Sequence, residues 1–364
     1  MEKYVLKSSA EDQSRPRPGE VVCIGIDQGL NKWVYAIRWG GALRQTFAAP
    51  SELGHLQALV KRYAGHEVRI VHEACGFGYA ISRWAQDYKE QVVRVTVVPP
   101  STIEQRPGRR VKTDRIDARK LALKLEQGDL KSVWVPSVEQ ELARQIGRTQ
   151  QQVAKERRRA QTQVRSMLKA HGYKAPAEAK SWSGYERWLK QLPLPEELQQ
   201  CVGHLLGVRT QAAKSEQKLL RRLRQMSEGE PHAKVVKEWT KLSGVGWLSA
   251  IRILLELGEV RRFARRGSLP HYLGLTPSEY STGDDVNRGP VLRCGPARVR
   301  CHLIENAWIA VRRDQELRER FNRIAGTSPT SQRKKIAIVA VAHRRAMQLR
   351  ALWKQTEVVA QPTM

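Results

Sequence analysis

Two short apolar runs that each lead into a carboxylate constrain the fold most. Residues 21–26 read as a buried strand that stops on Asp27. Residues 68–71 read as another buried strand, and that segment ends at Glu73. Buried strands ending in acids predict an α/β sheet with carboxylates gathered at one edge.

The rest of the N-terminal third fills in this sheet. We predict further strands at 33–37, 43–48 and 92–98. Helices are expected at 51–63, with Ser51 as N-cap, at about 77–88, and from near Thr113 onward. Three strands, helix, strand, helix, strand and a final helix is the order of an RNase H-like (RuvC-like) α/β domain.

The final helix carries two more acids, Asp114 and Asp117, in the sequence K-T-D-R-I-D-A-R. Their spacing puts both on one helix face. Oxygen ligands suit Mg²⁺ or Mn²⁺, and two such ions can activate an attacking oxygen and stabilise a leaving one. Each acid alone is more often a turn former or part of a solvated helix face than a catalytic residue. Together with Asp27 and Glu73, in this order, they favour a metal-dependent catalytic site.

The charge of the chain indicates its partner. Among 364 residues, 64 are Lys or Arg and 36 are Asp or Glu, a formal net charge of +28. Such a protein gains affinity for nucleic acid by releasing condensed counterions. No apolar stretch is long enough to span a membrane, and five scattered cysteines predict buried, reduced thiols. We therefore expect a cytoplasmic protein that acts on a nucleic-acid phosphodiester.

Several blocks together resemble one known family. G-I-D at 25–27, H-E-A-C-G-F-G-Y at 72–79 and the K-T-D-R-I-D-A-R block are similar to the signature of the DEDD-type insertion-sequence transposases, serine-dependent recombinases guided by a bridge RNA. L-S-G-V-G at 242–246 resembles the family's helix-hairpin-helix, and residues 272–283 resemble its nucleophile block. The resemblance covers about residues 20 to 350.

The resemblance implies a composite active site. Metal bound by the four acids would act with a C-terminal hydroxyl that forms a covalent link to the DNA phosphate. It also implies donor and target DNA, a noncoding guide (bridge) RNA and a homo-oligomer, dimer to tetramer, as partners. The family has Ser directly before the Gly of the nucleophile block, where this chain has Thr282, with Ser281 one residue earlier. Either hydroxyl fits, and Ser281 is preferred because β-branched Thr is more hindered.

The remainder of the chain reads as mainly helical. A long polar helix from Glu139 to Ala170, with eight basic and two acidic residues in 141–170, and a returning helix at 196–226 predict an antiparallel helical hairpin or coiled coil. We expect a flexible N-terminus (1–19), a catalytic domain (20–130), this hairpin (135–230), a C-terminal transposase domain (235–352) and a flexible tail (353–364).

Twelve residues are predicted to contact nucleic acid. They are basic side chains, or glycines in a turn whose amides can grip a phosphate. They are Arg109, Arg110, Lys112, Arg157, Arg158, Arg159, Gly244, Gly246, Arg261, Arg262, Arg293 and Arg300.

Two other functions remain open on the sequence. A junction resolvase or nuclease would use the RNase H-like domain alone, with water as nucleophile, and would not need the hydroxyl block at 281–282. A packaging or regulatory protein derived from a transposase would not need the four acids intact.

Overall fold

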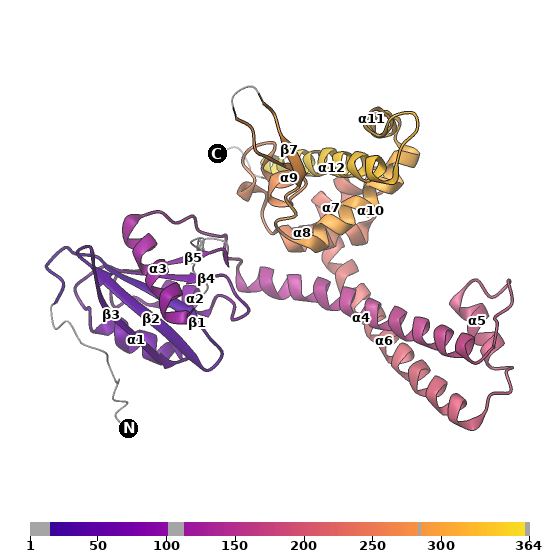
Figure 1. The fold of residues 1–364 in the computed structure, drawn as a ribbon, viewed down its shortest axis with the longest axis horizontal. Helices are drawn as coiled ribbons and strands as arrows, with labels where there is room; N and C mark the ends of the chain where they lie inside the picture. The colour runs from indigo at the N-terminus through magenta and orange to yellow at the C-terminus, as the bar shows by residue number, and fades with distance from the viewer. Residues whose placement is uncertain (1–14, 101–112, 283–284, 361–364) are drawn as a thin grey trace. The chain divides into compact units, whose positions relative to one another are not determined.

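A computed structural model describes residues 15–100, 113–282 and 285–360. The chain divides into two compact units, Met1–Val135 and Pro136–Met364, which we call the N-terminal and C-terminal units and describe separately (Figure 1). The predicted contacts Arg109, Arg110 and Lys112 lie outside the described residues.

The N-terminal unit is a five-stranded mixed sheet with three helices. Its strand order is β3-β2-β1-β4-β5; β1 pairs antiparallel with β2 and parallel with β4, and β4 pairs parallel with β5. The predicted element order is confirmed. The elements are β1 (Val22–Gln28), β2 (Lys32–Trp39), β3 (Ala42–Pro50), α1 (Leu53–Lys61), β4 (Val68–Glu73), α2 (Ala80–Asp87), β5 (Val93–Val98) and α3 (Asp114–Gln127).

Helices cover both faces of this sheet. Alternate residues of β1 point to opposite faces, so Val22, Ile24 and Ile26 pack in one core with residues of α1 and α2. Cys23 packs on the other face with Leu121 and Leu125 of α3. A sheet buried on both faces explains why β1 reads as a continuous apolar run rather than an alternating one.

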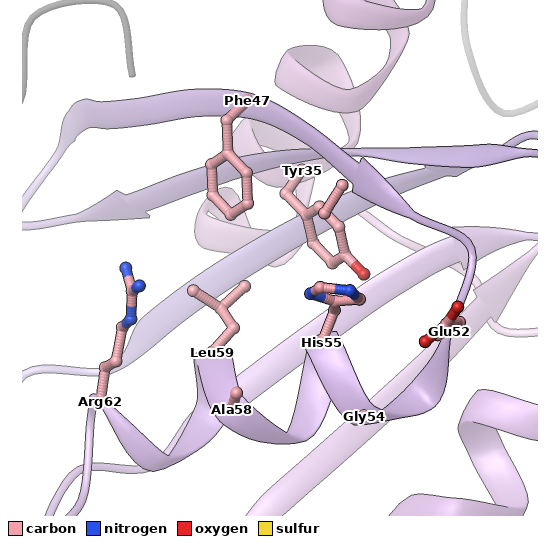
Figure 2. A pocket seen from close by; sticks show the side chains of 9 residues that line it. Tyr35, Phe47, Glu52, Gly54, His55, Ala58, Leu59 and Arg62 are labelled. Atoms are coloured by element: carbon pink, nitrogen blue, oxygen red, sulfur yellow. The ribbon is translucent and has the colours of Figure 1, made fainter. Parts of the chain in front are cut away.

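A pocket of about 310 Å³ lies between α1 and the strands β2 and β3 (Figure 2). Tyr35 and Phe47 stack at 5.1 Å between ring centroids in its wall. Figure 2 shows the Tyr35 hydroxyl directed toward His55 and the Glu52 end of the pocket. Tyr35 is only 1% exposed, and within the described parts of the chain its hydroxyl has no hydrogen-bond partner. Burial raises the pKa of this phenol, because the charged form would lose its hydration.

The C-terminal unit begins with a helical hairpin. Its helices are α4 (Val138–Ala170), α5 (Trp182–Leu189) and α6 (Glu196–Glu228). The hairpin is antiparallel, because Val164 and Leu168 near the end of α4 pack with Leu198 and Val202 near the start of α6. The sequence predicted the two long helices but missed the short helix α5 at the turn.

The rest of this unit is a helical bundle with one small β-hairpin. Its helices are α7 (Ala233–Thr240), α8 (Trp247–Leu257), the short 3-10 turn η2 (Val260–Arg262), α9 (Ser268–Tyr272), α10 (Ala297–Arg313), α11 (Gln315–Ala325) and α12 (Ser331–Ala360); the strands are β6 (Pro277–Glu279) and β7 (Arg288–Val291). Trp239 is fully buried and packs edge-on against Trp353 at 5.7 Å. Helix α12 therefore belongs to the core beyond residue 352, where the sequence suggested a flexible tail.

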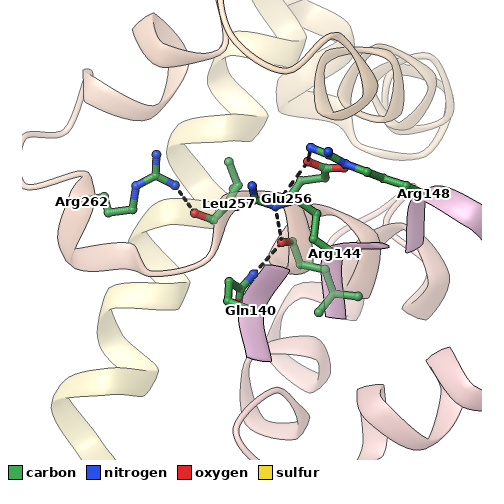
Figure 3. Close-up of polar contacts among 7 residues, drawn as sticks. Gln140, Arg144, Arg148, Glu256, Leu257 and Arg262 are labelled. Carbon is green, nitrogen blue, oxygen red and sulfur yellow. Dashed lines mark hydrogen bonds and ion pairs between the residues drawn. The ribbon is translucent and has the colours of Figure 1, made fainter. Parts of the chain in front are cut away.

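Polar side chains tie α4 to the end of α8 (Figure 3). Glu256 is 6% exposed and accepts from Arg148 Nε at 2.7 Å and Nη2 at 2.8 Å. Gln140 donates to the Leu255 carbonyl at 2.6 Å, and Arg262 donates to that of Leu257. The last carbonyls of a helix lack partners within the helix and carry partial negative charge, so these donors cap α8.

Two other expectations need correction. Ser51 is not the cap of α1: Glu52 holds that position and Ser51 donates to the Leu30 carbonyl at 2.7 Å. Only Cys23 is buried, whereas the other four cysteines are exposed; all five are free thiols. Burial raises the pKa of Cys23 to about 11. In the described parts of the chain, no helix is long and apolar enough to cross a membrane.

Candidate active site and nucleic-acid contacts

Parallel pairing sets Asp27 beside Glu73. Ile26 of β1 is in register with His72 of β4, and the two acids follow directly in their strands. Asp27 lies on the same face of its strand as Cys23, and Glu73 on the same face as Val71; Cys23 and Val71 pack against α3. The two carboxylates therefore project on the α3 face at the carboxyl ends of neighbouring strands.

Helix α3 runs antiparallel to β1 and delivers the other two acids to the same end. Cys23 packs near Leu121 and Leu125, and Gly25 lies against Ala118 and Ala122. One further step along β1, to Asp27, therefore corresponds to the first turn of α3, which contains Asp114 and Asp117. Asp114 is exposed and Asp117 is 7% exposed. Acids in the first turn also suit the positive end of the helix dipole.

Gly25 makes this close approach of α3 to β1 possible. No role for this glycine was predicted from the sequence. A Cβ at Gly25 would lie 2.2 Å from the Ala118 carbonyl oxygen and 2.6 Å from the Ala122 nitrogen. The helix backbone thus rests directly on the strand backbone. The signal was a glycine inside an otherwise apolar strand, a pattern typical of close backbone approach.

The donor set is chemically suited to a hard divalent cation, since all four side chains offer carboxylate oxygens. Nevertheless, in the part of the chain that the structure describes, no three His, Cys, Asp or Glu side chains are grouped closely enough to hold a metal ion. The backbone brings the four acids to one end of the sheet, but in this conformation their side chains are not close enough together to bind one metal ion.

The candidate nucleophiles lie at the end of the β6–β7 hairpin in the C-terminal unit. Ser281 and Thr282 are both exposed. The Ser281 hydroxyl donates to Glu279 Oε1 at 3.0 Å. The Thr282 amide donates to the Asp285 carbonyl at 3.2 Å, and the Asp285 amide donates back to the Thr282 carbonyl at 3.2 Å. Of the two hydroxyls, that of Ser281 has a carboxylate within hydrogen-bond reach in the structure.

In the turn between α7 and α8, only one of the two glycines predicted to contact phosphate is exposed. Gly244 has φ +86°, and a Cβ there would lie 2.5 Å from the Asn306 carbonyl oxygen in α10. Arg345 of α12 donates to the Ser243 carbonyl at 3.0 Å. Gly244 is therefore needed for packing against α10. Gly246 is exposed at the N-cap of α8, and no side chain caps that helix start.

Comparison with protein families identifies the chain. Residues 24–172 match the family model of the IS110-type DEDD transposases, whose description is "Transposase", and residues 237–322 match the model described as "Transposase IS116/IS110/IS902 family". The first match includes the sheet, the four acids and α4, and the second includes Ser281 and Thr282. The chain belongs to the IS110/IS116 family of DEDD transposases.

Curated relatives of this family agree. The chain is 32% identical over 263 residues to "Putative transposase y4qE" of Sinorhizobium fredii, covering 71% of this chain and 63% of that protein. It is 22% identical over 250 residues to "Transposase for insertion sequence element IS1111A" of Coxiella burnetii, covering 67% and 66%. The chain thus spans slightly less than two thirds of each of these two relatives.

Several predicted contact residues of this family member instead have structural partners. Arg262 caps α8 and lies over the rings of Phe263 and Tyr272 at 5.2 and 5.1 Å. Arg300 donates to the carbonyls of Leu273 at 3.0 Å and Cys294 at 2.6 Å, and so holds the base of the β-hairpin. Each of these two guanidinium groups already donates to a backbone carbonyl, so a phosphate would have to compete with that carbonyl.

The other predicted arginines differ in exposure. Arg157, predicted to contact nucleic acid, instead faces the seam of the hairpin, where its Nε donates to Glu216 on α6 at 2.5 Å. Arg158 and Arg159 are exposed. Arg261 pairs with Glu259 but is 79% exposed, and Arg293 is exposed with φ +53°. Arg158, Arg159, Arg261 and Arg293 remain accessible to a ligand.

Proposed function

We propose that this chain is a DNA transposase that cleaves and rejoins strands to excise and insert its mobile element. The observation that carries the proposal is the position of Asp27, Glu73, Asp114 and Asp117 at one end of a mixed sheet in a DEDD transposase family member. The sheet is of the RNase H-like (RuvC-like) class in this proposal. Membership of a transposase family supports DNA as the substrate.

The four carboxylates would hold Mg²⁺ or Mn²⁺, which supplies charge neutralisation at the phosphodiester and stabilises the leaving oxygen. Binding would require the side chains to move closer together than they lie here. Buried Asp117 would be the most fixed of the four, and exposed Asp114 the most adjustable. Their shared negative charge would repel the DNA backbone without the cation.

Ser281 is our proposed nucleophile. Its Oγ would attack phosphorus while its proton passes to the Glu279 carboxylate, 3.0 Å away. A bond forms between Oγ and phosphorus, and the bond from phosphorus to the deoxyribose oxygen breaks, which leaves a phosphoserine-type link. Attack by the released strand end on that link would rejoin DNA and regenerate the hydroxyl. Thr282 is the alternative nucleophile.

The proposed partners are donor DNA, target DNA and a guide (bridge) RNA, bound by a dimer to tetramer of this chain. The net charge of +28 supports polyanionic partners. Exposed Arg158, Arg159, Arg261 and Arg293 are candidate contacts. The α7–turn–α8 segment would act as a helix-hairpin-helix through the open amides at Gly246.

The test is a strand-transfer reaction with end-labelled donor DNA, guide RNA and Mg²⁺, resolved on a denaturing gel. We expect a protein–DNA adduct in the wild type and in Thr282→Ala, and none in Ser281→Ala. Asp117→Asn should abolish the adduct while RNA binding persists. Glu279→Gln should slow adduct formation, because the amide cannot take up the Ser281 proton.

Each outcome separates the alternatives. An adduct lost in Thr282→Ala and kept in Ser281→Ala would assign the nucleophile to Thr282 instead. Cleavage by the wild type without any adduct would favour a RuvC-like nuclease or junction resolvase that uses water. An adduct that survives both hydroxyl variants would overturn the assignment of this block.

A further inference from the structure

The end of the helical hairpin contains a pocket lined by cations. It has a volume of about 470 Å³, and its polar lining includes Arg165, Lys169, Tyr173, Lys174, Lys180 and Tyr185. We call these six residues and the space they enclose the tip pocket. They come from the end of α4, the following loop and α5. Every charged side chain that lines the tip pocket is basic.

Aromatic rings hold one of these cations in place. The Arg165 guanidinium lies 5.1 Å from the centroid of the Tyr185 ring and 5.8 Å from that of Trp182. These two rings stack at 5.4 Å, and Arg209 of α6 lies over Trp182 at 5.2 Å. A guanidinium on a ring face keeps its N–H edges available, and its fixed position reduces the entropy lost on binding.

Among the residues that the structure describes, the four cations have no acidic partner. Arg165, Lys169, Lys174 and Lys180 are exposed, and no carboxylate within the described ranges forms an ion pair with them. Four positive charges around one concavity repel each other unless an anion neutralises them. The arrangement therefore favours a ligand with more than one negative charge over a second copy of this basic chain.

The volume of the tip pocket and its tyrosines narrow the class of ligand further. A pocket of this volume lies in the range of about 300–1,000 Å³ that encloses small ligands. Half-buried Tyr173 is anchored by a hydrogen bond from its hydroxyl to the Pro193 carbonyl at 3.4 Å, and adds a ring to the wall. An aromatic wall with surrounding cations is typical of sites that take an unpaired nucleotide, because its base can leave the stack.

We infer that the tip pocket binds an unpaired nucleotide of a nucleic-acid strand, with the cations on its phosphates and Tyr173 against its base or sugar. This inference rests on the nucleic-acid partners of the proposed function, and it adds a binding site far along the chain from the catalytic acids. RNA and single-stranded DNA share this chemistry, so the experiment includes both.

The test measures affinity of the full chain for fluorescent single-stranded RNA, single-stranded DNA and duplex DNA of equal length across a salt series. The variant is Lys169→Gln/Lys174→Gln/Lys180→Gln. Its matched control, Lys214→Gln/Lys218→Gln/Arg221→Gln, removes three exposed charges from α6 of the same hairpin. All six side chains are on the surface, and equal melting temperatures would confirm that both variants fold.

We expect the tip variant to bind RNA or single-stranded DNA about ten-fold more weakly, with the slope of log affinity against log salt reduced by about 2, since each phosphate contact contributes about 0.7. The control variant should lose much less affinity for the same strand. The strand type that is affected identifies the source of the ligand. Arg165→Lys, which keeps the charge and loses the ring stacking, should weaken the same strand by a smaller factor.

Three results would overturn the inference. The first is an equal loss of affinity in the tip variant and in the control variant. The second is an equal loss of affinity of the tip variant for duplex DNA and for single strands, which would indicate a general basic surface. The third is unchanged binding with a changed oligomeric state in light scattering, which would make the tip a protein interface. Asp117→Asn should bind like the wild type, so a failure of the proposed catalysis is distinguishable from a failure of the tip pocket.

Discussion

Gly25 of β1 lies against Ala118 of α3 so closely that a Cβ on the glycine would stand 2.2 Å from the alanine carbonyl oxygen. This approach sets the height of α3 over the sheet, and therefore the position of Asp114 and Asp117 relative to Asp27. The first and last of the four acids along the chain, Asp27 and Asp117, are thus related through a residue with no side chain.

Gly25→Ala should lower the free energy of unfolding by about 1–3 kcal/mol, because the helix backbone must move to admit the methyl group. Adduct formation should fall further than stability alone explains, since α3 carries two acids. Denaturant unfolding and the strand-transfer gel measure the two effects. The control is Gly54→Ala in α1, where nothing lies within 4 Å of the added Cβ. That change should be neutral or stabilise by up to about 1 kcal/mol, because alanine favours a helix.

Tyr35→Phe should leave the free energy of unfolding unchanged or raise it. The buried hydroxyl has no hydrogen-bond partner in the described structure, and burying it costs about 1–3 kcal/mol in lost hydration. Phe at this position avoids that cost. Tyr35→Ala should instead lower stability by about 3–5 kcal/mol, because the stack on Phe47 is lost. Thermal unfolding compares the three proteins. A loss above about 1 kcal/mol in Tyr35→Phe would mean that the hydroxyl has a partner in solution.

Glu256→Ala should lower the free energy of unfolding by about 2–3 kcal/mol. The carboxylate is 6% exposed and accepts two hydrogen bonds from Arg148, whose partly buried charge would lose its partner. The comparison is Glu238→Ala, which removes an exposed pair with Lys241 and should cost below about 1 kcal/mol. Equal effects in denaturant unfolding would show that the junction of α4 and α8 carries little stability.

Thiol titration of the native protein at pH 8 should modify four cysteines rapidly and Cys23 only after unfolding. Burial raises the pKa of Cys23 to about 11, so the folded state keeps a proton that the unfolded state releases from pH 9 upward. The stability contributed by the neutral thiol is full below pH 9 and is lost as pH rises toward 11. In that window Cys23→Ala should show a slope of stability against pH smaller by up to about 1.4 kcal/mol per pH unit. Rapid reaction of a fifth thiol would contradict the burial of Cys23.

Local patterns predicted the elements because each depends on nearby residues. The runs before Asp27 and Glu73 are buried on both faces of a sheet, so their apolar character is visible without knowing their neighbours. The three-residue spacing of Asp114 and Asp117 likewise places both acids on one helix face by geometry alone. Where a pattern is weak, as at Ser51 or in the short helix α5, the boundary or the element was missed.

The amino-acid sequence by itself determined the order of strands and helices in the N-terminal unit, the basic charge and the family to which the chain belongs. Only the tertiary structure decided what each polar group contacts. It showed that Gly244 packs under α10, that Arg157 pairs with Glu216 across the hairpin, and that Ser281 donates to Glu279. Periodicity assigns a residue to a face, whereas its partner comes from a segment far away in the chain. An arginine that binds phosphate and one that caps a helix have the same local sequence signal, and packing alone separates them.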